Sequence, residues 1–360
     1  MTRLRVGDDF FNVVVEGQEN KPALLLSHSL GANLHMWDAQ VPVLTHHFRV
    51  IRYDSRGHGR SDAPRGPYSI WRLGRDALGV LDALGIEKAH VLGLSMGGFV
   101  GLWLLANARD RIGRAVLANT AASMPPPDTW NTRIRMAREN GMAAIAPMVA
   151  NLLFPKTFQD SSPAKVDRVR AMLAATPAHG YAACCAAIRD MDQRETIRSI
   201  TNPVLVIAGR QDQSTPPDRG RLVADSIPGA QFLVLDAGHL SNIEAEDAFN
   251  CAAVEFLTTP EKVAKPVKKP PVAAKPVEKP AAEPKAKSSA KKATKKKAAK
   301  KPRKPKAPAR KTAKKSAKKA ARKKPTKSAS RTSARKPARK PAHKPAAKAK
   351  ARSRAAAKKR

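Results

Sequence analysis

The amino-acid sequence predicts an α/β fold in which a mostly parallel β-sheet carries helices on both faces. Two observations support this prediction. Short apolar runs rich in β-branched residues alternate with helix-like segments over the first 260 residues. Several of these runs are apolar on both faces, as strands buried inside a parallel sheet are. Strands that alternate with helices in this way indicate a parallel sheet covered on both sides.

The expected elements follow in order along the chain. The runs expected to form strands are 11–15, 23–27, 49–53, 90–92, 114–118, 204–208 and 231–235. The helical patterns between them include 73–84, 99–107 and 218–226.

One stretch breaks this alternation. From about residue 125 to 200 there is no strand pattern, only helical stretches such as 129–139 and 166–175. The stretch begins with three consecutive prolines and ends before Pro203, where the strand pattern resumes. We therefore expect a helical lid over the sheet at about 125–200. The alternative is that these helices simply continue the layers on the sheet.

Charge divides the chain near residue 260. The sequence has 68 Lys and Arg against 29 Asp and Glu, a net charge of +39, but residues 261–360 hold 41 of the basic and 3 of the acidic residues. The last aromatic side chain is Phe256. A segment this charged and this poor in large apolar groups cannot offset its ordering entropy. We expect one domain over 1–260 and a disordered Lys/Ala/Pro-rich tail over 261–360.

Cysteine usage and hydropathy favour a cytoplasmic protein. The three cysteines do not form a disulfide framework, and Cys184 and Cys185 are adjacent, which is poor geometry for pairing with each other. A reducing compartment is therefore expected. No apolar run of signal-peptide type begins the sequence, and no stretch approaches transmembrane length. We predict no membrane span.

A serine nucleophile is expected directly after the run 90–92. Gly93-Leu94-Ser95-Met96-Gly97 follows this strand and precedes an apolar helical segment. A G-x-S-x-G pattern between a strand and a helix is typical of the nucleophile elbow, whose sharp turn lifts the serine hydroxyl above the sheet. Glycines are needed on both sides of the serine because side chains there would collide as strand and helix approach. The alternative is an ordinary Gly/Ser turn.

A serine nucleophile needs a base, and the base needs an orienting acid. His239 follows the run 231–235, and Asp212 follows the run 204–208, so each stands just past an expected strand. The chain order of serine, aspartate and histidine is that of the α/β-hydrolases. We predict a catalytic triad of Ser95, Asp212 and His239.

An oxyanion intermediate needs two backbone N–H groups aimed at its developing charge. Met96 N–H, directly after the nucleophile, is expected to be one of them. The loop after the run 23–27 contains His28-Ser29-Leu30-Gly31, and we expect Leu30 N–H to be the other.

Four other polar residues have different expected roles. Asp236 competes for the acid position but is expected to cap a turn. Asn119 stands after the run 114–118, the other place where such folds can carry the acid. We expect His28 to pack under the oxyanion loop, with direct catalysis as the alternative, and His58 to be structural in a glycine-rich turn. No cluster has metal-ligand spacing and no phosphate-binding loop occurs, so neither a metal nor a cofactor is predicted.

Four segments carry a family resemblance: HSLGANLHMWDAQVPVL, VIRYDSRGHGRSDAP, VLGLSMGGFVGLWLLA and FLVLDAGHLSNIEAED. Together they resemble the 3-oxoadipate enol-lactonases, a family of α/β-hydrolases, over roughly residues 10–256. The resemblance implies hydrolysis of 3-oxoadipate enol-lactone to 3-oxoadipate through an acyl-enzyme, in the β-ketoadipate route of aromatic breakdown. The sequence departs from the family at Ser29, where a glycine is usual, and in its basic tail.

The lid segment adds to this resemblance and implies a carboxylate-binding group. The segments beginning at Trp130 and at Thr176 fall where similar segments fall in those enzymes. Trp130 and Arg133, one helical turn apart, are the predicted substrate-binding residues, and Arg133 is expected to bind the carboxylate that the implied lactone carries. Arg135 and Arg138 share the segment, and the sequence does not choose among the three. The alternative for Arg133 is a solvated surface arginine.

Two other functions remain open at this point. One is hydrolysis of another small carboxylic ester, or of a carbon–carbon bond, because the pocket rather than the fold sets the chemistry. The other is a nucleic-acid-binding protein in which the hydrolase domain is incidental. The oligomeric state is not indicated by the sequence.

The tail resembles the Lys/Ala/Pro-rich tails of linker histones. It has no aromatic side chains on which bases could stack, and it is expected to form no element that could read base edges. We therefore predict that residues 261–360 bind DNA or another polyanion without sequence preference, driven by counterion release. A tail that only improves solubility is the alternative.

Overall fold

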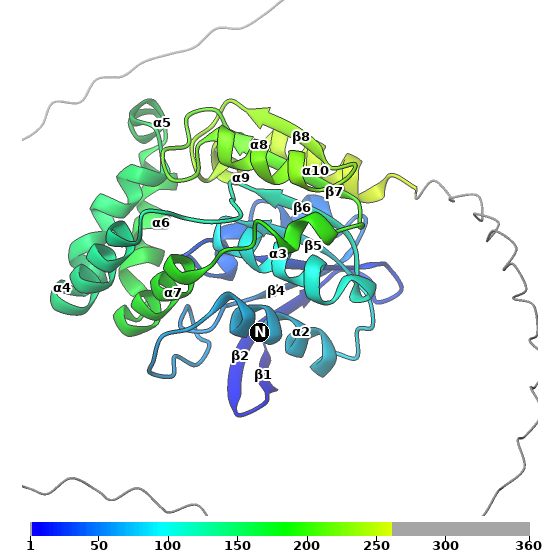
Figure 1. The fold of residues 1–360 in the computed structure, drawn as a ribbon, viewed down its shortest axis with the longest axis horizontal. Helices are drawn as coiled ribbons and strands as arrows, with labels where there is room; N and C mark the ends of the chain where they lie inside the picture. The colour runs from blue at the N-terminus through cyan, green and yellow to red at the C-terminus, as the bar shows by residue number, and fades with distance from the viewer. Residues whose placement is uncertain (1, 261–360) are drawn as a thin grey trace, which may run out of the picture. The chain divides into compact units, whose positions relative to one another are not determined.

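The computed structural model describes residues 2–260, and the predicted basic tail lies outside the described residues (Figure 1). One sheet has the strand order β1-β2-β4-β3-β5-β6-β7-β8. Its strands are β1 (Thr2–Val6), β2 (Asp9–Glu16), β3 (Ala23–Ser27), β4 (Arg49–Tyr53), β5 (Ala89–Leu94), β6 (Ile112–Ala118), β7 (Val204–Gly209) and β8 (Gln231–Leu235). β2 pairs antiparallel with β1 and β4, and all other pairings are parallel. The predicted mostly parallel sheet is confirmed.

The helices lie between the strands in sequence. The α-helices are α1 (Val41–Leu44), α2 (Ile70–Ala83), α3 (Met96–Asn107), α4 (Pro127–Leu153), α5 (Lys156–Ser161), α6 (Pro163–Ala175), α7 (Ala178–Asp190), α8 (Pro217–Ser226), α9 (Ser241–Glu244) and α10 (Glu246–Thr258). The short 3-10 helices are η1 (Leu34–Trp37), η2 (Arg109–Arg111) and η3 (Thr196–Ser199).

Each face of the sheet supports its own apolar core. Alternate strand residues, among them Leu25, Val91 and Val206, pack with α2, α3 and α8. Their neighbours on the opposite face, such as Leu24 and Leu92, pack with α1 and α10. Because successive side chains of a strand point to opposite faces, a fully apolar strand core serves both layers. Helices therefore cover both faces, as the sequence predicts.

Four helices, α4 to α7, occupy the chain between β6 and β7, where the sequence predicts a lid. Figure 1 shows them gathered on one side of the sheet. α4 contacts both α6 and α7. α4 is longer than the predicted 129–139 and breaks at Gly141, whose φ of 73° interrupts the helical backbone. The interruption suits glycine because it has no Cβ to clash at positive φ.

The first strand was not predicted, and its position explains why. β1 lies at the edge of the sheet and pairs only with β2. Its residues Thr2, Arg3 and Arg5 are exposed. An edge strand with one solvated face needs few apolar residues, so it lacks the continuous apolar run of the inner strands.

Candidate active site

Ser95 occupies a strained turn between β5 and α3. Its backbone has φ 57° and ψ −114°, values that a non-glycine residue adopts only when its surroundings impose them. A Cβ at Gly93 would come within 2.3 Å of the Gly97 carbonyl oxygen, and one at Gly97 within 1.9 Å of the Ser27 carbonyl oxygen. Both glycines are therefore required for the close approach of strand and helix. The local geometry is that expected of a nucleophile elbow.

His239 and Asp212 meet beyond the ends of β8 and β7. His239 Nδ1 lies 2.8 Å from Asp212 Oδ2 and 3.0 Å from Oδ1. Because a carboxylate only accepts hydrogen bonds, the histidine must donate its Nδ1–H. In the neutral ring Nε2 is then the acceptor, and it has no hydrogen-bond partner within residues 2–260. This is the tautomer that a general base requires.

The Asp212 carboxylate is held by several donors besides the histidine. The backbone N–H groups of Ser214 and Thr215 donate to Oδ1 at 2.8 and 2.9 Å. Thr215 Oγ1 and Asn119 Nδ2 donate to Oδ2 at 2.7 and 2.9 Å. Burial would raise the pKa of Asp212, but the charge of His239 and these hydrogen bonds lower it overall. The acid therefore stays ionised beside the histidine.

Asn119, named above only as a position that could carry the acid, has a different function in the structure. It follows β6 with φ 48°. Besides Asp212, its amide donates to the Gly238 carbonyl at 3.1 Å and accepts from Ser241 Oγ at 2.6 Å. One buried side chain thus connects the acid to the loop that carries His239. The sequence offered no signal for this connection or for Thr215.

Ser95 and His239 line one cavity at the carboxyl ends of the parallel strands, and lid helices close it. The cavity is small, about 30 Å³ in volume. Its lining residues are Ser29, Leu30, Ser95, Phe99, Met124, Trp130, Arg133, Val149, Leu153, Tyr181, Ile188, Ser214, Thr215 and His239. Loops at the carboxyl ends of parallel strands are the usual place for such sites.

The two predicted oxyanion donors lie beside Ser95. Leu30 lines the cavity, and Met96 is the first residue of α3. Neither backbone N–H donates a hydrogen bond within the described part of the chain. Both groups are thus available at this edge of the sheet, as an oxyanion site requires.

Known proteins were compared with this chain. Residues 22–246 match the model of the alpha/beta hydrolase fold. The chain belongs to this family. It is 41% identical to 3-oxoadipate enol-lactonase 2 of Acinetobacter baylyi, over 69% of this chain and 93% of that protein. The structure of the enol-lactonase from Burkholderia xenovorans LB400 is 43% identical, with a TM-score of 0.69 over 70% of this chain and 98% of that one. A hydrolase from Pseudomonas aeruginosa PA01 is 46% identical, with a TM-score of 0.69 over 71% and 97%.

These similarities establish the enzyme class of the chain. It is a hydrolase with the α/β-hydrolase fold, and its folded part is similar in sequence and structure to enol-lactonases. The fold class, the class of enzyme and the family resemblance predicted from the sequence are confirmed. The basic tail has no counterpart in the matched regions.

The lid of this α/β-hydrolase contributes one cation to the cavity. Arg133 lines it and lies over the Trp130 ring, with its guanidinium carbon 5.1 Å from the ring centroid. The Trp130 indole N–H donates to the Met124 carbonyl, which fixes the ring. Arg135 and Arg138 are exposed on the same helix and do not line the cavity. The sequence left open which of the three arginines binds the carboxylate. In the structure Arg133 lines the cavity, whereas Arg135 and Arg138 face away from it on the same helix.

The other buried histidines of the α/β-hydrolase use both ring nitrogens for backbone contacts. His28 contacts the Ser29 carbonyl and accepts from the Ser55 N–H. His58 contacts the Arg56 carbonyl and accepts from the Gly31 N–H. Neither ring has a free nitrogen for proton transfer.

The competing acid, Asp236, is 77% exposed at its side chain and lies outside the cavity. A carboxylate in that position has no route to the His239 ring. The candidate acid therefore remains Asp212, which is buried against the histidine.

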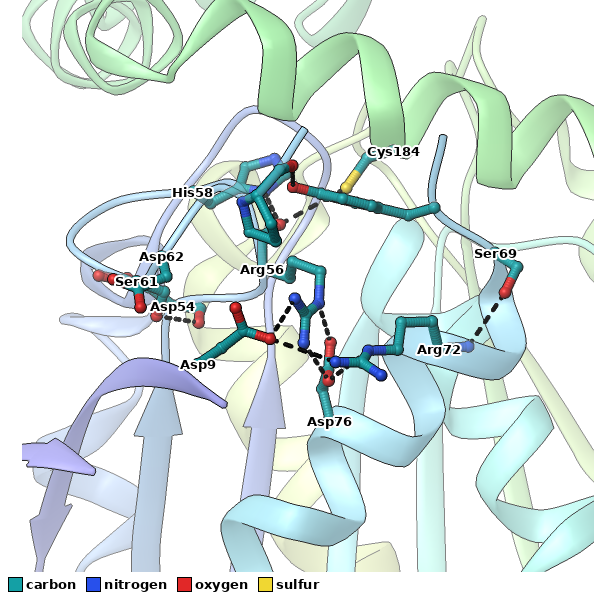
Figure 2. Close-up of polar contacts among 12 residues, drawn as sticks. Asp9, Asp54, Arg56, His58, Ser61, Asp62, Ser69, Arg72, Asp76 and Cys184 are labelled. Atoms are coloured by element: carbon teal, nitrogen blue, oxygen red, sulfur yellow. Dashed lines mark hydrogen bonds and ion pairs between the residues drawn. The ribbon is translucent and has the colours of Figure 1, made fainter. Parts of the chain in front are cut away.

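A second buried polar cluster lies where the loop after β4 meets β2, α2 and the lid helix α7 (Figure 2). Arg56, from the loop after β4, donates from Nε and Nη2 to both carboxylate oxygens of Asp76 at 2.7 Å and from Nη1 to Asp9 at 2.6 Å. Arg72 approaches both acids from α2. The Cys184 thiol from the lid contacts the Arg56 carbonyl. Burial opposes the charge of Arg56, but the two carboxylates raise the pKa of its guanidinium.

Within residues 2–260, no group of three or more His, Cys, Asp or Glu is placed to hold a metal ion. In the same residues no single helix is both long and apolar enough to cross a membrane. α6 and α7 meet that criterion only when combined across a bend of 97°.

Proposed function

We propose that residues 1–260 form a domain that hydrolyses 3-oxoadipate enol-lactone, or a closely related enol-lactone with a carboxylate arm. Ser95, His239 and Asp212 act as nucleophile, base and orienting acid, and Leu30 and Met96 supply the oxyanion N–H groups. The proposal is supported by the strained turn at Ser95, the His239–Asp212 contact and the enol-lactonases among the similar proteins.

One observation points to a substrate with a negative charge. Arg133 lies in the same cavity as Ser95, and no carboxylate of residues 2–260 forms an ion pair with it. A cation sheltered beside Ser95 and left without a carboxylate partner favours an anionic substrate. Trp130 holds the guanidinium from one face. We propose that these two lid residues bind the carboxylate arm.

The chemistry follows from these positions. His239 Nε2 removes the hydroxyl proton as Ser95 Oγ attacks the lactone carbonyl, and the two N–H groups stabilise the oxyanion. The ring carbon–oxygen bond breaks, and the enol oxygen takes the proton from His239 Nε2 and leaves while still tethered to the acyl group. Water activated by His239 then hydrolyses the acyl-enzyme. The released enol becomes the ketone by moving its proton to carbon.

The test compares a carboxylate-bearing enol-lactone with a neutral ester on the Arg133→Met variant. We expect kcat/KM for the lactone to fall by roughly 10- to 100-fold, as for loss of a charge-assisted contact of ~1.5–3 kcal/mol. Hydrolysis of the neutral ester should change little. Arg135→Met and Arg138→Met, on the exposed face of the same helix, are the matched controls.

Other outcomes would favour the alternatives. If the chain hydrolyses simple esters or a carbon–carbon bond substrate well and the lactone poorly, the substrate assignment is wrong although the triad stands. If Arg133→Met slows both substrates equally, the arginine does not bind the carboxylate arm.

We propose separately that residues 261–360 bind polyanions such as duplex DNA. The support is sequence alone, namely 41 basic and 3 acidic residues in this segment. Duplex-DNA affinity of the full chain should fall steeply between about 50 and 300 mM salt because binding releases counterions. A chain ending at residue 260 should bind negligibly while retaining hydrolysis. Salt-insensitive binding, or equal binding by the shortened chain, would contradict this proposal.

A further inference from the structure

Tyr181 has a buried hydroxyl without a hydrogen-bond partner. The residue lies in α7 and is 0% exposed. Its Oη reaches hydrogen-bonding geometry with no group of residues 2–260. A buried hydroxyl left without a partner costs free energy, so it is uncommon unless another molecule completes its contacts.

The surroundings of this hydroxyl indicate what that molecule presents. Tyr181 lines the same cavity as Ser95 and Arg133. Burial raises the pKa of the phenol, the neighbouring Cys185 thiol adds to the effect, and the nearby charge of Arg133 opposes it. The phenol therefore keeps its proton near neutral pH and can donate it. The Arg133 guanidinium therefore lies close enough to the Tyr181 hydroxyl to affect its pKa.

The rest of the ring is fixed in place. Both ring carbons nearest the oxyanion loop lie within 3.5 Å of where a Cβ at Gly31 would be, so the ring packs directly against that loop. The Gly31 carbonyl accepts from Thr176 at the lid, which joins the lid to the same loop. A ring held this way presents its hydroxyl in one position, as a binding group must.

We propose that the Tyr181 hydroxyl is the second donor of a carboxylate subsite and that Arg133 is the first. The two donors would bind the two oxygens of the substrate's carboxylate arm. That this arm belongs to a lactone rests on the proposed function. Tyr181 is then a specificity-determining residue that selects acids over neutral esters of the same shape. Its hydroxyl takes no part in the bond-breaking steps.

The test measures the binding of a carboxylate in a reaction that does not use the lactone. Adipate should inhibit hydrolysis of the neutral ester 4-nitrophenyl acetate by the full chain, with adipamide as the uncharged comparison. In Tyr181→Phe the inhibition constant for adipate should rise about tenfold, as for loss of a hydrogen bond to a charged group. The inhibition constant for adipamide should rise much less, because an uncharged amide loses no hydrogen bond to a charged group.

Stability separates this role from a structural one. Because the Tyr181 hydroxyl has no partner, Tyr181→Phe should unfold at the same urea concentration as the parent or a higher one. The matched control is Tyr68→Phe, which removes a hydroxyl that donates to the Pro64 carbonyl at 2.6 Å. It should lose stability and keep the parent's inhibition by adipate.

Each way in which the proposal could fail gives a different set of inhibition results. Unchanged adipate inhibition in Tyr181→Phe, with inhibition weakened in Arg133→Met, would overturn the role of Tyr181 and leave the proposed function standing. Weakened adipate inhibition in both variants, in an enzyme that does not hydrolyse the enol-lactone, would support the carboxylate subsite and reject the lactone as its substrate. Equal weakening of adipate and adipamide in Tyr181→Phe would also overturn the proposal.

Discussion

Two buried polar clusters of this enzyme differ in how completely their groups are paired. Around Arg56, the donors face two carboxylates, and the side chains of Arg56 and Asp76 are 3% and 6% exposed. Around His239 burial is equally deep, with 3% exposure for the histidine and 0% for Asp212. Yet His239 uses only Nδ1 for the acid, and its other nitrogen is left to the cavity.

The difference separates structural from reactive polar groups. A buried group whose hydrogen bonds are all made to the protein can only hold segments together. A buried group with one unused acceptor that lines the same cavity as the strained Ser95 can move a proton. The same rule applies to His28 and His58, which are as buried as His239 but have both ring nitrogens occupied. Pairing, rather than burial or residue type, is the discriminating property.

The sharpest way to break this comparison is to remove the nucleophile. Ser95→Ala should lower kcat by at least about 10³-fold, as loss of a triad nucleophile does elsewhere. The free energy of unfolding should not fall, because the Ser95 side chain forms no capping hydrogen bond to α3 that alanine would lose. Urea unfolding and steady-state hydrolysis of one ester check both. A variant that keeps most of its turnover would reject Ser95 as the nucleophile.

The paired cluster should respond in the opposite way. Asp76→Ala leaves the buried Arg56 guanidinium short of its bidentate partner, so the free energy of unfolding should drop by about 3–5 kcal/mol. The folded fraction should keep a kcat close to that of the parent. Asp82→Ala is the matched control on the same helix, since its pair with Arg111 is exposed and worth ~1 kcal/mol or less. A stable Asp76→Ala with impaired kcat would place the cluster in catalysis instead.

The sequence predicted the residues whose positions depend on strand ends, and their catalytic roles stay a prediction. Ser95, Asp212 and His239 each follow an apolar strand, and a parallel sheet brings such ends to one edge. Residues whose roles arise from contacts between distant segments were missed, because no local pattern marks them. In the sequence Tyr181 looks like any residue on the apolar face of a helix. It comes near Arg133 only when α7 packs against α4. Asn119 gained its function only once the loops after β6 and β8 were in contact.

Buried histidines whose ring nitrogens are both hydrogen-bonded, such as His58, should make the free energy of unfolding depend on pH. Burial, with a contribution from His28, lowers the pKa of His58 from 6.5 to about 3. The unfolded chain takes up this proton below about pH 6.5, whereas the folded chain does not until about pH 3. The full stability contribution is therefore present above pH 6.5, and it falls as the pH falls toward 3.

Between pH 6.5 and 5 the loss should be up to about 1.4 kcal/mol per pH unit for this one proton. Urea unfolding at several pH values checks the slope. His58→Gln should flatten it, and His46→Gln, an exposed histidine, should leave it unchanged. Parallel slopes for all three proteins would show that His58 is not the group responsible.

The smallest effect on kcat is expected when one hydrogen bond to Asp212 is removed and Ser95, His239 and Asp212 themselves are kept. Thr215→Val keeps the side-chain shape and removes the hydroxyl that donates to Asp212 Oδ2 at 2.7 Å. Three other donors besides His239 remain, so kcat should fall only about 2- to 10-fold, for a hydrogen bond of ~0.5–1.5 kcal/mol. The pKa of Asp212 should rise, because one of the hydrogen bonds that lower it is gone. Because a protonated Asp212 cannot hold the His239 ring in place, that rise should move the loss of activity in acid to higher pH. Thr196→Val, whose hydroxyl bonds a backbone carbonyl outside the cavity, should leave both kcat and the profile unchanged. A Thr215→Val enzyme with the parent's rate and pH profile would mean that the backbone N–H groups and Asn119 hold Asp212 without help from this hydroxyl.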